Sequence, residues 1–229
     1  NQIQKKLENV FSLSGHEVFA AVSIGIALNN SEGPNPEELL RDAETAMYRA
    51  KAMGKARCEI FDAEMHAHAV SLQTIESDLR RAIERQEFLV YYQPILSLRS
   101  GRITGFEALV RWMHPQKGLV SPLEFIPVAE ETGLIVPVGE WVLRTACVQS
   151  RDWRVPGGIG PLSIAVNFSA VQFESKGLVP SIKKILRETG RDSSSLGIEI
   201  TESVAMSNLP STMKILKELH ELGVQILRE

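Results

Sequence analysis

Acidic and amide side chains near the ends of apolar segments are the residues of this sequence best suited to chemistry. Glu107 lies in the segment 106–111, Asn167 closes the segment 164–167, and Glu199 follows Ile198 in another apolar run. Isolated carboxylates among such neighbours are costly to bury or are forced neutral, so a cation is expected beside them. Two glutamates and an asparagine form an all-oxygen ligand set, which suits Mg²⁺, Mn²⁺ or Ca²⁺ better than zinc.

A purely structural interpretation of the same residues also stands. The two-residue period of a strand places Glu107, Leu109 and Arg111 on one face, so Glu107 and Arg111 can simply pair. Asn167 can cap a loop, and perturbed carboxylates also occur in structural networks. Glu202 follows the segment of Glu199, where an acidic residue often serves only as a charge at a helix N-terminus.

The elements that must position these residues alternate between strand and helix. We expect strands over 89–96, 103–112, 162–167, 197–201 and 224–227, and helices over 122–132, 138–153, 178–189 and 210–222. Only six residues join the first two strands, too few for a parallel crossover, so they should form an antiparallel hairpin. The later alternation predicts a mainly parallel sheet or a (β/α) barrel with its helices outside.

The amino-terminal part has a different pattern. Residues 18–28 read as a buried strand, and a helix should follow, with Asn35 as N-cap, Pro36 at its first position and Glu38 completing a capping box. Gly54 is the expected stop of that helix. A short strand over 57–61 and a helix over 63–85 come next, and we place a domain boundary near residues 62–72.

Composition excludes several classes of protein. The chain has 229 residues, 44% of them hydrophobic, and 25 basic against 28 acidic residues give a net charge of -3. No sequence-wide attraction to DNA, RNA or anionic membrane is expected. Cys58 and Cys147 are far apart, which predicts two reduced thiols in a cytoplasmic protein. The longest apolar stretch, 19–28, is about half the length of a membrane span, so no membrane segment is expected.

Five blocks of residues carry a resemblance. They are, in order, Tyr91-Tyr92-Gln93-Pro94-Ile95, Phe106-Glu107-Ala108-Leu109-Val110-Arg111-Trp112, Pro122-Leu123-Glu124-Phe125-Ile126-Pro127-Val128-Ala129-Glu130, Val166-Asn167-Phe168-Ser169 and Glu199-Ile200-Thr201-Glu202-Ser203. Through these blocks the chain resembles the EAL-type cyclic di-GMP phosphodiesterase family. The resemblance implies hydrolysis of one phosphodiester bond of cyclic di-GMP with Mg²⁺ or Mn²⁺, Ca²⁺ being inhibitory or non-productive.

The resemblance also implies a role for individual residues. Glu107, Asn167 and Glu199 would bind the first metal. Glu202 would order a loop beside the site, and it joins Glu107 and Glu199 as a catalytic residue. Gln93, Leu109 and Arg111 would contact the substrate. Separately, Phe125 and Ile126 either wall a guanine pocket or pack in the core.

Residues 22–27 and 42–55 resemble the carboxyl-terminal part of a GGDEF-type diguanylate cyclase domain. In that family, positions matching Lys51 and Lys55 help bind nucleotide phosphates, and their spacing puts them on one helix face. The alternative is that they complement the helix dipole. Because the signature loop of the family is not in this sequence, diguanylate cyclase activity is not expected.

The expected fold is therefore α/β, an incomplete TIM-type (β/α) barrel of the EAL type with an antiparallel first strand, preceded by an α+β GGDEF-domain remnant. The expected parts are 1–62, a linker helix region at 63–71, and the barrel part at 72–229. After 224–227 the family continues into a pair of aspartates for a second metal, whereas this chain reads Arg228-Glu229. The chain alone is therefore expected to be inactive. Its parent protein would hydrolyse cyclic di-GMP. Segments outside this chain could tether that parent protein to a membrane.

Two alternatives to an enzyme stand beside it. One is a non-catalytic module that binds cyclic di-GMP. The other is an interaction fragment that forms a homodimer through an unpaired strand edge.

Overall fold

The computed structural model describes residues 2–7, 11–13, 16–18, 20–28, 35–154, 162–201, 204 and 210–228. The chain divides into two compact units, Asn1–Thr74 and Ile75–Glu229. The division falls within the helix α3, which spans Ala63–Arg85 as the sequence predicts. The finer domain boundaries near 62 and 72 remain a prediction. Among the described residues, no helix is both long and apolar enough to cross a membrane.

The first unit contains short strands around one long helix. Its elements are α1 (Gln2–Leu7), β1 (Phe11–Leu13), β2 (His16–Val18), β3 (Ile24–Ile26), α2 (Pro36–Ala52) and β4 (Cys58–Ile60). The expectation of one buried strand over 18–28 is wrong, because β3 has only three residues and all are half-buried. Among the described strands β3 pairs only with β4, in parallel, and their ladder joins three residues of each strand.

Helix α2 begins where its capping residues predict. The Asn35 side chain accepts a hydrogen bond from Glu37 N at 3.1 Å, and Pro36 is the first helical residue. The capping box with Glu38 does not form, because the cap accepts from the second helical amide rather than the third. The helix ends at Ala52, two residues before Gly54, whose φ of 105° only glycine adopts readily.

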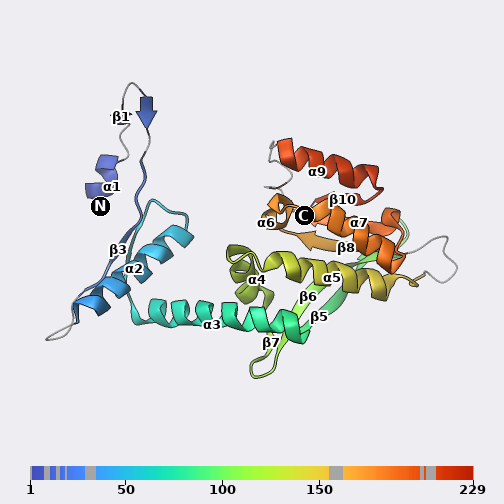
Figure 1. Ribbon diagram of the computed structural model, residues 1–229, viewed down its shortest axis with the longest axis horizontal. Helices are drawn as coiled ribbons and strands as arrows, with labels where there is room; N and C mark the ends of the chain where they lie inside the picture. Colours follow the sequence, from blue (N-terminus) through green and yellow to red (C-terminus); the bar gives the residue numbers. More distant parts are fainter. Residues whose placement is uncertain are drawn as a thin grey trace. The chain divides into compact units, whose positions relative to one another are not determined.

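The second unit is built on one mixed sheet (Figure 1). Its strands are β5 (Phe88–Leu96), β6 (Ile103–His114), β7 (Gly118–Val120), β8 (Ser163–Phe168), β9 (Leu196–Ile200) and β10 (Gln225–Arg228). The strand order is β10-β9-β8-β6-β5, with β7 also paired to β6. As predicted, β5 and β6 are antiparallel, whereas β6, β8, β9 and β10 are parallel. The described strands thus form an open sheet, consistent with an incomplete TIM-type barrel.

Helices cover one face of this sheet. They are α4 (Pro122–Glu131), α5 (Ile135–Ser150), α6 (Ala170–Glu174) and α7 (Leu178–Thr189), with α9 (Pro210–Glu221) after β9 and a short 3-10 turn, η1 (Ser193–Ser195), before it. In Figure 1, α5 and α7 lie side by side along the sheet, and the two helices are in contact. The sequence analysis did not predict β7, α6 or η1, which have only three to five residues each.

Alternate residues of each strand point to opposite sides, and the two sides differ in burial. Ala108, Trp112, Ile164, Val166 and Ile198 are all at most 2% exposed and form the core beneath the helices. On the other side, Tyr91 and Gln93 of β5 are exposed, and Glu107 and Leu109 of β6 are half-buried. This second side is the one that carries the polar residues singled out above.

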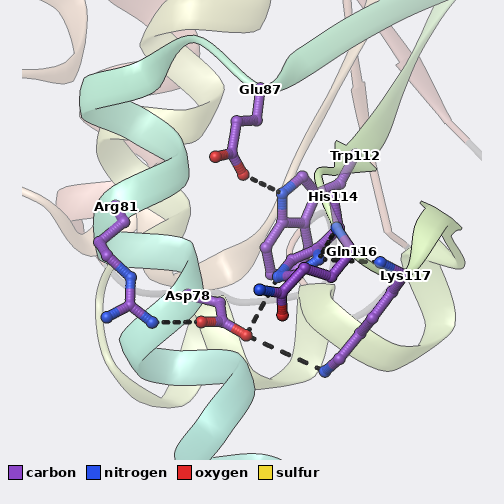
Figure 2. Close-up of polar contacts among 7 residues, drawn as sticks. All are labelled: Asp78, Arg81, Glu87, Trp112, His114, Gln116 and Lys117. Atoms are coloured by element: carbon purple, nitrogen blue, oxygen red, sulfur yellow. Dashed lines mark hydrogen bonds and ion pairs between the residues drawn. The ribbon is translucent and has the colours of Figure 1, made fainter.

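A polar network fastens α3 to the end of β6 (Figure 2). Asp78 of α3 accepts from His114 Nε2 at 3.2 Å and also pairs with Arg81 and Lys117. The nearby Trp112 Nε1 donates to Glu87 Oε2 at 3.1 Å, and the rings of Trp112 and His114 meet edge to face. The strand that carries Glu107 is therefore held at its far end by hydrogen bonds as well as by its pairing.

Candidate functional site

Three predicted ligand residues lie on neighbouring parallel strands, near the carboxyl ends of the β6–β8 and β8–β9 ladders. Glu107 is on β6, Asn167 on β8 and Glu199 on β9. In the β8–β9 ladder Asn167 is directly opposite Glu199, and in the β6–β8 ladder Glu107 is opposite Ala165, two residues before Asn167. The period of two therefore places all three side chains on the same face. The sequence suggested this convergence, and the register produces it.

Glu107 and Asn167 are in direct contact. Asn167 Nδ2 donates to Glu107 Oε1 at 2.6 Å, although sixty positions separate the two residues in the sequence. Turning the carboxamide about its last bond exchanges its nitrogen and oxygen, so the same position can present Oδ1 beside the carboxylate. Two carboxylates and an amide oxygen on one face are suitable ligands for a hard divalent cation. The residues present therefore fit such an ion.

A cavity of about 310 Å³ opens beside these residues. Glu107, Asn167 and Glu199 line it together with Leu109 and Arg111. Its apolar wall comes from α4 and α5, with Pro122, Ile126, Ile135, Val138 and Val142. Glu130 of α4 also lines it, so three carboxylates face one guanidinium. This excess of negative charge favours a cation in the cavity, and the volume is in the range of small-molecule sites.

Arg111 is the positively charged side chain among the described residues that line the cavity. Its Nη1 donates to the carbonyl oxygen of Val110 at 2.8 Å, and its guanidinium carbon lies 5.3 Å from the centre of the Tyr91 ring. Stacking on an aromatic ring orients a guanidinium without using up its hydrogen-bond donors. The alternative pairing of Arg111 with Glu107 is absent from the ion pairs of the described residues. Arg111 can thus offer donors to an anionic ligand.

The other predicted residues differ in whether they line the cavity. Leu109 lines the cavity beside Arg111. Gln93 lies directly opposite Glu107 in the β5–β6 ladder and is exposed, but it does not line the cavity. Glu202 lies outside the described residues. Phe125 is fully buried in the core, whereas Ile126 contributes to the cavity wall.

The sequence analysis gave no role to four polar residues of the cavity, which are Glu130, Ser169, Gln172 and Thr201. Ser169 follows β8, and Gln172 lies in α6; both line the cavity. Gln172 Oε1 accepts from Ser169 N at 3.0 Å. The spacing Ser-x-x-Gln is a capping-box pattern and was the available signal, but it indicates a helix start rather than a place in a cavity.

In the first unit, Lys51 and Lys55 do not share a helix face. Lys51 lies in the last turn of α2, with Nζ 5.2 Å from the centre of the Tyr48 ring. The helix ends at Ala52, and Lys55 has a φ of 62° in the turn that follows. The prediction of an i, i+4 pair is wrong because the helix stops before it reaches Lys55.

The fold is a partial TIM-type barrel that carries two glutamates and an asparagine on one face of its sheet. The families that the chain matches agree with this description. Residues 76–227 match the EAL domain family, so the chain belongs to that family. Residues 1–57 match the diguanylate cyclase, GGDEF domain, family.

Curated relatives are longer chains that match almost the whole of this one. The chain is 42% identical over 225 residues to the bifunctional diguanylate cyclase/cyclic di-GMP phosphodiesterase MucR of Pseudomonas aeruginosa, covering 98% of this chain and 33% of MucR. It is 35% identical over 226 residues to the cyclic di-GMP phosphodiesterase PdeR of Escherichia coli, covering 99% and 34%. The chain thus spans about a third of the length of these relatives.

Solved structures agree with the fold. The PaMucR phosphodiesterase in its c-di-GMP complex is 46% identical, with a TM-score of 0.62, over 67% of this chain and 62% of that chain. The FimX EAL domain from Pseudomonas aeruginosa, bound to c-di-GMP, is 26% identical, with a TM-score of 0.60, over 68% and 61%. Both similarities cover about two thirds of this chain.

Proposed function

We propose that this chain binds cyclic di-GMP together with a divalent cation at the cavity of Glu107, and that the longer protein to which it corresponds hydrolyses the dinucleotide. One observation carries the proposal: Glu107, Asn167 and Glu199 share one face of three adjacent strands, beside a cavity that also holds Arg111. The family match and the ligand named in the structure of PaMucR support this choice of substrate.

Glu107, Asn167 and Glu199 are the residues that would hold the cation. When bound, Mg²⁺ or Mn²⁺ supplies charge to non-bridging phosphate oxygens and lowers the pKa of a coordinated water. Ca²⁺ accepts longer and less regular coordination, so we propose that it supports binding but not turnover. The hydrogen bond between Asn167 and Glu107 keeps the two side chains together before any ligand arrives.

The remaining predicted residues would hold the dinucleotide. Arg111 would donate its planar fork of N–H groups to a phosphate, a geometry that lysine does not offer. Leu109 would contribute apolar contact from the strand position next to the carboxylates. Gln93, opposite Glu107 on β5, would reach the part of the ligand that extends beyond the cavity.

Calorimetric titration of the 229-residue chain with cyclic di-GMP, in the presence of Ca²⁺, tests the proposal. We expect binding by the wild type, and a loss of more than about tenfold in affinity for Glu107→Gln and for Glu199→Gln, because each removes a charged ligand. Glu218→Gln is the matched control, since Glu218 is on α9 and does not line the cavity. Absence of binding by the wild type would overturn the proposal.

A second measurement separates binding from hydrolysis. The linear dinucleotide is assayed with Mg²⁺ for the complete parent protein and for the Glu107→Ala variant of it. We expect product from the former and none from the latter. A parent protein that binds cyclic di-GMP but releases no linear dinucleotide would favour the non-catalytic binding module instead.

A further inference from the structure

Arg111 lies on a part of β6 that has one neighbouring strand among those described. The pairing of β6 with β8 ends at Ala108, and its pairing with β7 begins at Trp112. Between these two points β6 pairs with β5 alone. Leu89 of β5 is directly opposite Arg111, and Tyr91, two residues further along β5, is its diagonal neighbour on the same face. The strand that can hold the Arg111 side chain is therefore β5.

The ring of Tyr91 is the group that contacts the guanidinium. The guanidinium carbon of Arg111 lies 5.3 Å from the centre of the ring. The hydroxyl of Tyr91 makes no hydrogen bond to a described residue, so the ring alone makes the contact. Arg111 lines the cavity and Tyr91 does not. Tyr91 can therefore act on a ligand in the cavity through Arg111, without touching that ligand.

Carboxylates that can pair with Arg111 line the same cavity. They are those of Glu107, Glu130 and Glu199. A guanidinium and a carboxylate commonly form a charge-assisted pair, yet Arg111 forms no ion pair with a described residue. Such a pair would occupy N–H groups that a phosphate needs and would neutralise a carboxylate that a cation needs. Because the guanidinium lies against the Tyr91 ring instead, both charges stay available.

We propose that Tyr91 is a positioning residue that holds Arg111 apart from the carboxylates of the cavity. This inference rests on the proposed function, because it assigns Arg111 to phosphate and the carboxylates to a cation. The face of an aromatic ring attracts a guanidinium and leaves its N–H groups unused. A side chain that is already ordered also loses less conformational entropy when the ligand binds. Tyr91 thus prepares the cavity for an anion and a cation at once.

The first test is the affinity for cyclic di-GMP, measured by calorimetry with Ca²⁺. Tyr91→Leu keeps an apolar residue in the strand but removes the ring, and we expect it to lower the affinity roughly 3- to 10-fold. Tyr91→Phe retains the ring and should recover most of the loss. Tyr48→Leu is the matched control, because the Tyr48 ring lies 5.2 Å from Lys51 Nζ in the first unit and does not line the cavity.

A double-mutant cycle shows whether the ring acts through the arginine. In the Arg111→Gln background the guanidinium is gone, so adding Tyr91→Leu should change the affinity for cyclic di-GMP by less than about twofold. A ring that contacted the dinucleotide itself would lower the affinity equally in both backgrounds. Circular dichroism melting confirms that each variant is folded before its affinity is used.

The same cycle is repeated with Mn²⁺ alone, whose free concentration is followed by electron paramagnetic resonance. We expect Tyr91→Leu to weaken Mn²⁺ binding roughly 2- to 5-fold, because the released guanidinium pairs with a carboxylate of the cavity. The double variant Tyr91→Leu, Arg111→Gln should bind Mn²⁺ as tightly as Arg111→Gln does. Arg111 is not a ligand of the cation, so this cycle stays measurable where the affinity for the dinucleotide is low.

The outcomes separate this inference from the proposed function. If the wild type binds neither Mn²⁺ nor cyclic di-GMP, both are overturned. If it binds them and Tyr91→Leu binds them as tightly or more tightly, the positioning role is refuted while the proposed function stands. A loss that persists in the Arg111→Gln background also refutes it. A loss confined to chains that contain Arg111, with Tyr91→Phe and Tyr48→Leu close to the wild type, establishes the role of Tyr91.

Discussion

His114 at the end of β6 donates through Nε2 to the carboxylate of Asp78 on α3, 3.2 Å away (Figure 2). The other ring nitrogen, Nδ1, accepts from the backbone N–H groups of Gln116 and Lys117, each at 3.1 Å. With two donors aimed at Nδ1, that nitrogen acts as the acceptor of the ring and Nε2 as the donor. One buried side chain thus joins a helix to the turn between β6 and β7.

Replacing His114 should weaken the fold at this turn. The His114→Ala variant leaves two backbone donors without their acceptor and removes one of the hydrogen bonds to Asp78, which keeps Arg81. An unsatisfied buried group costs about 1–3 kcal/mol. Urea unfolding at pH 7 measures the change. His220→Ala is the control, because His220 is exposed at the end of α9. Equal unfolding free energies for the two variants would contradict the role given to His114.

The pH dependence of stability should carry the signature of Asp78. Burial by itself raises the pKa of Asp78, but hydrogen bonds from Arg81 and His114 outweigh it and hold the pKa below its ordinary value of 3.8. Because the folded-state pKa is the lower one, the carboxylate stabilises the fold above the unfolded value and loses this contribution as pH falls through the folded value. Unfolding free energies measured from pH 7 to pH 3 should decline less steeply for Asp78→Asn than for the wild type. Asp152→Asn, at an exposed position, should keep the wild-type slope.

Arg191 should be among the most sensitive positions for stability. It is 5% exposed; Nη1 donates to Ser150 O and Oγ, and Nη2 donates to the carbonyl oxygens of Leu162 and Ser195. These acceptors lie at the end of α5 and beside the starts of β8 and β9. We expect Arg191→Leu to cost more than about 3 kcal/mol, because several buried carbonyl groups lose their donor at once.

Arg187→Leu is the matched control for that variant. Arg187 is exposed in the last turn of α7, and its replacement should leave the free energy of unfolding within about 1 kcal/mol of the wild type. If Arg191→Leu unfolds at the same temperature as this control, the hydrogen bonds of Arg191 contribute little to stability.

Gly105 should be intolerant of a side chain. A Cβ there would lie 1.9 Å from Ser163 Oγ and 2.7 Å from the Ser163 carbonyl oxygen. Because Gly105 and Ser163 begin the β6–β8 pairing, Gly105→Ala should separate the strands that bring Glu107 to Asn167. We expect a loss of about 1–3 kcal/mol in unfolding free energy and weaker binding of cyclic di-GMP.

A double variant checks the cause of that loss. Ser163→Gly added to Gly105→Ala removes the hydroxyl but not the carbonyl oxygen, so it should recover only part of the stability. Full recovery would show that the hydroxyl alone opposes the side chain.

Long amphipathic helices and the hairpin of the barrel part were predictable from the sequence. The helix over 178–189 and the helix over 63–85 have the predicted bounds, because their apolar residues repeat at helical spacing and Gly190 ends the former with a φ of 67°. The strand over 18–28 was not predictable in the same way. Its apolar composition favours a strand, but the length of a strand depends on its neighbours, and β3 has one described partner.

By itself, the sequence determined which residues alternate along each strand, and it identified Glu107, Asn167 and Glu199 as candidate ligands by residue type and family blocks. Only the tertiary structure decided that Asn167 contacts Glu107 and that Gln172 lines their cavity. The physical reason is register. Hydrogen bonds between β6 and β8 set which side chains become neighbours, and that pairing joins residues sixty positions apart, beyond the reach of any local pattern.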